Sequence, residues 1–214
     1  MKTFAGWIKY LEDGEDPICL SASSRSAPPE KLTWLGNCSQ LLGSQGRPPV
    51  RTHGLGETST LNCHEFPFTT VDSRRWFLAA AYGHIPIPIY CNGKPDYTHD
   101  PITVFMTERS RGRSNHIDRR DDRPRIDRFL AEVGVDVRQC REGMAHRCKV
   151  WLKYFAGVEA SSGVQIFHVT DLSRGQSEIL DAAGIERRLV SYFLLQNRPD
   201  NALANYVGAR ANGF

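Results

Sequence analysis

The chain has 214 residues, of which 40% are hydrophobic and 24% are charged, and its formal net charge is +3. These values are ordinary for a folded globular protein and exclude a wholly disordered chain. No apolar run approaches the roughly 18–20 residues that a membrane-spanning helix needs. The start of the chain lacks the apolar core of a secretion signal, so we expect a cytoplasmic protein with no membrane partner.

The first 91 residues alternate between predicted strands and predicted helices. Prolines mark one helix start, alanine-rich sequence marks another helix, and short apolar runs mark the strands. Glycine-rich sequence at 54–58 predicts a tight turn directly after a strand. Strands separated by helices or turns at intervals of 20–30 residues indicate parallel β/α units. The predicted elements, in chain order, are a helix at 3–12, a strand at 18–22, a helix beginning at Pro28 or Pro29, strands at 50–53 and 68–71, and a helix at 75–81 that Gly83 ends.

The rest of the chain begins with a polar segment. Residues 92–125 are polar and rich in helix-breaking residues, so they predict a loop. We expect three regions: β/α units at 1–91, this polar basic loop at 92–125, and an α/β region at 126–214 that packs on the same core. The elements predicted in the last region are helices at 126–133 and 149–155, a strand at 164–169, a helix at 177–183 and a strand at 189–195.

Arginines are concentrated in one part of the polar segment. Between Arg109 and Arg128 there are eight arginines and four aspartates. Such a stretch can follow the phosphates of a nucleic acid, with Arg109, Arg111 and Arg113 as candidate contacts. It can equally be a solvated loop whose arginines pair with its own aspartates. The sequence leaves both interpretations open.

The six cysteines are widely spaced and contain no C-x-x-C pair, so they predict no disulfide framework. The tightest cluster of metal-ligating residue types is Cys140, His146 and Cys148. These types can bind zinc, but their spacing matches no common set of zinc ligands. We therefore predict no metal and no other cofactor, and we interpret the cluster as reduced thiols near a surface histidine.

Polar groups follow two neighbouring predicted strands, at the place where the active sites of β/α barrels lie. The first strand leads into the sequence HGLG at 53–56, whose glycines let backbone N–H groups approach a phosphate or a ring edge. The second ends in Asp72-Ser73, and a carboxylate there can act as nucleophile, general base or metal ligand. Each feature has a structural alternative: the glycines can form only a turn, Asp72 can cap the next helix, and His53 can be a core histidine.

Three short segments together resemble a known family. They read RTHGLGETSTL at 51–61, FTTVDSRRW at 68–76 and AAAYGHI at 79–85. This sequence resembles the last two strands of the tRNA-guanine transglycosylase superfamily, in particular its phage and bacterial DNA-modifying 7-deazaguanine transglycosylase-like members. The resemblance covers roughly residues 1–90 and is sharpest at 50–85. It implies a TIM-barrel-like α/β fold, in which a Gly-x-Gly turn follows one strand and an aspartate ends the next.

The resemblance also implies a reaction. Asp72 is similar to the nucleophile that attacks the ribose C1′, expels guanine and forms a covalent glycosyl-enzyme, which a 7-deazaguanine base then displaces. The target nucleotide would lie outside its stack. The implied partners are DNA or tRNA and a purine or 7-deazapurine base. The residues that would shape the base or ribose pocket are His53, Gly54, Gly56 and Ser73, and those that would hold phosphates are Arg74 and Arg75 together with the basic stretch.

A complete β/α barrel runs to about 250 residues, more than this chain has. The family's second catalytic aspartate and its zinc site have no evident counterpart here. We therefore expect an incomplete or rearranged barrel, completed by a second polypeptide or by another copy of the chain. Two alternatives stay open. One is a non-catalytic nucleic-acid-binding subunit of such an enzyme. The other is an unrelated enzyme that binds the phosphate of a small molecule at the Gly-Leu-Gly turn.

Overall fold

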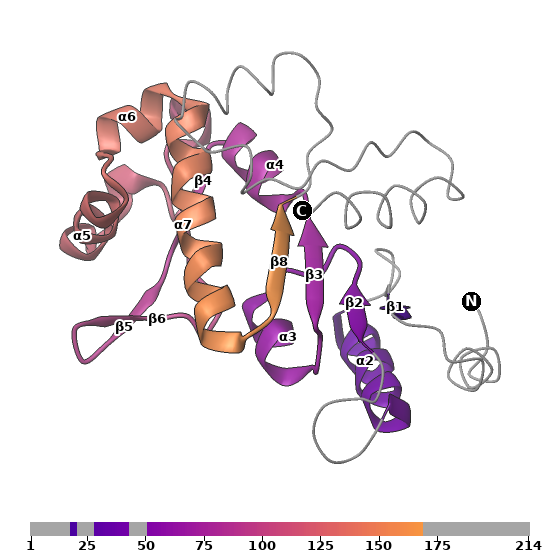
Figure 1. Ribbon diagram of the computed structural model, residues 1–214. Coiled ribbons are helices and arrows are strands. Elements are labelled where there is room, and N and C mark those ends of the chain that lie inside the picture. Colours follow the sequence, from indigo (N-terminus) through magenta and orange to yellow (C-terminus); the bar gives the residue numbers. More distant parts are fainter. Residues whose placement is uncertain (1–17, 21–27, 43–50, 169–214) are drawn as a thin grey trace, which may run out of the picture.

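The computed structural model describes residues 18–20, 28–42 and 51–168 (Figure 1). These residues form a mixed α/β structure. The helices are α2 (Pro28–Leu42), α3 (Thr60–Glu65), α4 (Arg75–Ala81), α5 (Arg123–Val133), α6 (Val137–Glu142) and α7 (Met144–Ser162). The strands are β1 (Ile18–Leu20), β2 (Thr52–Gly54), β3 (Thr70–Ser73), β4 (His84–Ile87), β5 (Ile89–Cys91), β6 (Lys94–Asp96), β7 (Ile102–Phe105) and β8 (Gln165–His168). The helices predicted at 3–12 and 177–183 and the strand predicted at 189–195 lie outside the described residues.

The largest sheet is parallel throughout, and its strand order, β1-β2-β3-β8, follows chain order. The prediction of parallel β/α units is therefore confirmed. All four strands of this sheet were expected from the sequence, with small differences in their bounds. Within the described residues the sheet is open, with β1 and β8 as its outer strands, and it does not close into a barrel.

The two faces of this sheet differ because side chains alternate along each strand. On one face, Leu20, Val71 and Ile166 are buried in the hydrophobic core. The strand register aligns Gly54 with these positions. A Cβ at Gly54 would lie 3.1 Å from side-chain atoms of three neighbouring residues, so close packing on this face favours glycine. The other face carries His53, Thr70, Asp72 and Phe167, which places the candidate chemistry on the more polar side.

A second region is built on β4 and β7, which pair antiparallel, and β4 packs with α7. Ile85 and Val104 are opposite each other in this pair, and both are fully buried. Trp151 of α7 donates a hydrogen bond from Nε1 to the His84 carbonyl at 3.0 Å. Because α7 also lies alongside β8, it joins this region to the parallel sheet (Figure 1).

The stretch predicted as a loop, 92–125, differs from the expectation. It contains β6, β7 and two 3-10 helices, η1 (Glu108–Ser110) and η2 (Ile117–Arg119). The buried apolar residues that fix β7 are few and stand between polar segments, so the sequence pattern is weak there. Two short helices, α3 and α6, were not predicted, and α7 extends well beyond the predicted 149–155. None of the helices in the described part of the chain combines the length and apolar character needed to cross a membrane.

Candidate functional site

The candidate site lies at the carboxyl edge of the parallel sheet, where β2, β3 and β8 end side by side (Figure 1). Asp72 is the second-to-last residue of β3, and β3 lies between β2 and β8 in the sheet. Its side chain keeps 18% of its surface exposed, so a small molecule or a nucleotide can approach the carboxylate. In parallel sheets this edge is where ligands bind, because the strand ends leave short loops and free side chains there.

The glycine-rich turn after β2 orients the Asp72 carboxylate. The backbone N–H of Gly56 donates a hydrogen bond to Asp72 Oδ1 at 2.6 Å. Gly56 adopts a φ of +71°, in the left-handed region that favours glycine. Among the described residues, no lysine or arginine forms an ion pair with Asp72. The turn therefore fixes one carboxylate oxygen with a neutral donor, and none of the described lysines and arginines compensates this carboxylate.

His53 lies beside this carboxylate. Its Nε2 is 3.8 Å from Asp72 Oδ1, and its Nδ1 is 2.7 Å from the Thr70 hydroxyl. Burial lowers the pKa of His53 below its ordinary value of 6.5, and the nearby Asp72 opposes this shift. The imidazole is therefore neutral at pH 7. His53 is buried, as the core alternative predicted, and it also faces the candidate nucleophile.

A buried carboxylate, which the sequence analysis did not identify, secures the turn. Glu57 has 2% of its surface exposed and forms an ion pair with Lys31 of α2. It also accepts a hydrogen bond from Asn62 Nδ2 of α3 at 2.9 Å. These contacts join the turn to two helices, and they support the position of the Gly56 N–H. The only local signal for this role is that Glu57 directly follows the Gly-Leu-Gly sequence.

His168, which ends β8, was also missed. It pairs in register with Ser73, one residue beyond the Asp72–Phe167 pair, so it belongs to the apolar face of the sheet. Its ring stacks on Phe155 at 5.6 Å, and its buried Nδ1 has no hydrogen-bond partner among the described residues. Burial lowers the pKa of His168 to about 4. Ser73 is the last residue of β3, and its backbone lies opposite His168.

The candidate phosphate contacts fall into two groups. Arg74 and Arg75 follow β3 directly, and both are exposed at the start of α4. Arg109, Arg111 and Arg113 lie in the segment after β7, in and around η1. The structure therefore brings Arg74 and Arg75 next to Asp72 along the chain and places the other three in the second region.

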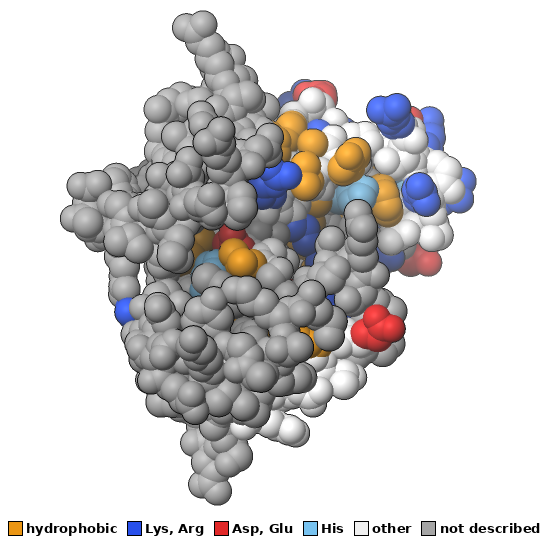
Figure 2. Space-filling view, turned by 90° about the vertical axis from the view of Figure 1, so that its right-hand side faces the viewer, with side chains coloured by type: hydrophobic (Ala, Val, Ile, Leu, Met, Phe, Trp, Pro, Cys, Tyr) orange, Lys and Arg blue, Asp and Glu red, His pale blue; other side chains and the backbone are white. Residues whose placement is uncertain are grey.

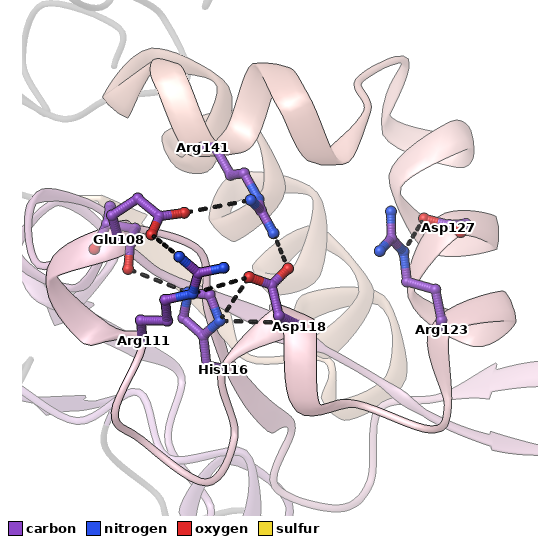
Figure 3. A network of polar contacts seen from close by, with 8 residues as sticks. Glu108, Arg111, His116, Asp118, Arg123, Asp127 and Arg141 are labelled. Carbon is purple, nitrogen blue, oxygen red and sulfur yellow. Dashed lines mark hydrogen bonds and ion pairs between the residues drawn. The ribbon is translucent and has the colours of Figure 1, made fainter.

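Part of the basic stretch is neutralised by its own acids (Figure 3). Arg111 lies 3.2 Å from Glu108 and 3.8 Å from Asp118, and Arg141 of α6 pairs with the same two acids. Two further internal ion pairs join Arg120 to Asp122 and Arg123 to Asp127. For these arginines the solvated, internally paired interpretation describes the structure. No such pair within the described residues involves Arg109 or Arg113.

The cysteine cluster does not form a metal centre in the described part of the chain. Cys140 of α6 and Cys148 of α7 are buried, free thiols. Burial raises the pKa of each to about 12, so both are held in the neutral form. No group of three or more histidine, cysteine, aspartate or glutamate side chains among the described residues is placed to hold a metal ion.

Comparison with family models, with curated proteins and with solved structures finds no match to this chain.

Proposed function

We propose that the chain is a guanine transglycosylase-like enzyme, or the nucleophile-bearing part of one, that inserts a 7-deazaguanine base into DNA or tRNA through a covalent intermediate on Asp72. One observation carries this proposal. Asp72 stands at the carboxyl end of a central parallel strand, with one oxygen held by the Gly56 N–H at 2.6 Å and with part of its surface open. This is the position that the sequence resemblance implies for the nucleophile.

In this reaction Asp72 attacks C1′ of the target nucleotide as the bond from C1′ to the guanine nitrogen breaks. Guanine leaves with the electron pair of that bond and takes up a proton, and a glycosyl ester remains on the enzyme. The incoming base then attacks C1′, loses a proton and releases the carboxylate. Two displacements replace one difficult exchange, as in retaining glycosidases.

The neighbours of Asp72 suit this role. A neutral His53 does not form an ion pair with the carboxylate, so the imidazole does not tie Asp72 to a cation. The hydrogen bond from the Gly56 N–H to Asp72 Oδ1 fixes which oxygen faces the substrate. The contacts of Glu57 with α2 and α3 hold the turn, so the donor does not have to be ordered when the substrate arrives.

The sheet topology supports a barrel-like arrangement as part of the proposal. In a β/α barrel each parallel strand pairs with the next along the chain, and the helices cover one face only. The order β1-β2-β3-β8 has the first property. Right-handed crossovers that all run in one direction place their helices on the same face, so Asp72 would point to the inside of the barrel. Further strands would come from elsewhere in the chain, from a second polypeptide or from another copy.

The test is exchange of radiolabelled guanine into DNA and into tRNA by the purified chain. We expect Asp72→Asn to lower incorporation by at least about a thousandfold, because the amide cannot form the glycosyl ester. Asp118→Asn is the matched control, since Asp118 also lies beside a histidine but is paired with arginines. It should incorporate at the wild-type rate. Full activity of Asp72→Asn would contradict the proposed nucleophile, and no incorporation by the wild-type chain would favour a non-catalytic subunit.

A further inference from the structure

Aromatic and basic side chains meet on the surface at the far end of α4. Tyr82, which follows α4, is 71% exposed. Its ring centroid is 6.4 Å from that of His84, which in turn packs edge-on against Phe105 at 4.2 Å. The guanidinium of Arg113 lies over the Phe105 ring at 5.9 Å. We call Tyr82, His84, Phe105 and Arg113 the aromatic–arginine surface. On the face shown in Figure 2, hydrophobic side chains and a histidine lie side by side, with basic side chains around them.

The charge on this surface is not neutralised in the way that the nearby network is. Arg111, two residues before Arg113, is paired with Glu108 and Asp118. Arg113 instead contacts an aromatic ring, and within the described residues its guanidinium has no carboxylate partner. Burial lowers the pKa of His84, and the nearby positive charges of Arg113 and Arg75 lower it further.

Tyr82 is not the only exposed hydrophobic residue at this end of α4. Leu78, one helical turn before Tyr82, is 45% exposed and lies on the same side of α4. His84 is neutral at pH 7 because its pKa is lowered, so its ring presents an aromatic face rather than a charge. An exposed ring close to an arginine that has no carboxylate partner among the described residues is the combination by which proteins bind unpaired nucleotides: bases stack on the ring and phosphates approach the cation.

We propose that the aromatic–arginine surface binds the unpaired nucleotides of a single-stranded stretch of DNA or RNA, with a base stacked on Tyr82 and a phosphate at Arg113. The inference deepens the proposed function and rests on it for the choice of a nucleic acid as partner. Helix α4 runs from the residues that follow Asp72 to Tyr82, and its seven residues span about 10 Å. The surface would therefore hold nucleotides near the one whose base is exchanged.

The experiment measures binding of fluorescein-labelled oligothymidine and oligouridine to the full chain by fluorescence anisotropy at several salt concentrations. We expect Tyr82→Ala to weaken binding by roughly five- to a hundredfold, which corresponds to the loss of one stacked base. Tyr82→Phe should bind like the wild type because it keeps the ring. Arg113→Gln should weaken binding and reduce the slope of log affinity against log salt by about 1.

A matched control is present elsewhere in the molecule. Arg128 lies over the Tyr90 ring at 5.0 Å, but Glu132 is 3.5 Å from its guanidinium. Arg128→Gln therefore removes an arginine of the same geometry whose charge is already compensated, and it should leave binding unchanged.

The outcomes separate this inference from the proposed function. Binding that falls in Tyr82→Ala and Arg113→Gln, and persists in Asp72→Asn, supports the surface whatever the exchange assay gives. Binding that is unchanged in Tyr82→Ala and Arg113→Gln overturns the surface and leaves the role of Asp72 to the exchange assay. No binding by the wild-type chain at low salt also overturns it, because an uncompensated arginine next to exposed rings should then be most effective.

Discussion

Two aspartate–histidine pairs in this molecule have similar geometry and different surroundings. At the edge of the parallel sheet, His53 Nε2 is 3.8 Å from Asp72 Oδ1. At the start of η2, His116 Nδ1 is 3.6 Å from Asp118 Oδ2. Both histidines are buried, with 5% and 0% of their surfaces exposed. The difference lies on the aspartate side. Arg111 and Arg141 pair with Asp118 (Figure 3), whereas a backbone N–H is the hydrogen-bond donor to Asp72.

This difference shows what makes a carboxylate available for chemistry. An aspartate with two arginine partners has its charge compensated and its position fixed by side chains, so it serves to hold the segment after β7 against α6. An aspartate held at a strand end by a main-chain donor to one oxygen keeps its other oxygen for a ligand. The neighbouring histidine is therefore not informative by itself. The partners of the carboxylate decide its role.

The largest effect on stability is expected from the buried histidine beside the site. The pKa of His168 is about 4 in the folded protein and near 6.5 in the unfolded chain, so the unfolded chain binds more protons between these pH values. Stability is therefore lost as the pH falls from about 6.5 to 4, by about 3 kcal/mol from this group. We expect His168→Phe to remove this part of the pH dependence while keeping an aromatic ring against Phe155.

Urea unfolding at pH 7 and at pH 4.5 measures this effect. The difference in the free energy of unfolding between the two pH values should be smaller in His168→Phe than in the wild type. Equal differences in both proteins would mean that His168 is not held neutral by burial. The result would also show whether the rings of Trp76 and Phe155, which contact His168, keep water away from this face of the sheet.

An intermediate effect on stability is expected at the turn that holds Asp72. Gly56→Ala places a side chain at a φ of +71°, which costs about 1–2 kcal/mol in the left-handed region. A shift of the turn also moves the N–H that donates to Asp72. Exchange activity should therefore fall even under conditions where the variant is fully folded. Gly112→Ala is the matched control near the Asp118 pair, because a Cβ there meets no atom within 4 Å. Equal activity in both variants would show that the Gly56 donor does not position Asp72.

The sequence predicted the site edge better than its contacts. Asp72 was identified because it ends an apolar run, and the turn because it contains two glycines, so both signals are local. The hydrogen bond from Gly56 to Asp72 depends on the register of β2 against β3, which no local pattern determines. His168 and Glu57 were missed for the same reason. A single histidine or glutamate gains its role from residues that pack on it from distant parts of the chain.

In the predicted loop at 92–125, the sequence left the partners of the arginines undecided. Arg141 reaches Glu108 across 33 positions and Asp118 across 23, so the part of the network that Arg141 makes depends on where α6 lies. Helix α6 was not predicted, although Asp136 and Gln139 form a capping box at its start. The pairs of Arg111 with Glu108 and Asp118 are local, and the sequence analysis left them open as one of two interpretations of the basic stretch.

The smallest effect on stability is expected at Asp118, the aspartate that is paired with arginines. Asp118→Asn removes the ion pairs with Arg111 and Arg141, but these groups are partly solvated and Arg141 keeps Glu108. The free energy of unfolding should therefore fall by no more than about 1 kcal/mol, and the loss should shrink at high salt. Urea unfolding at low and at high salt checks both statements. A larger loss that does not depend on salt would mean that Asp118 fixes the second region through its contact with buried His116 rather than through the arginines.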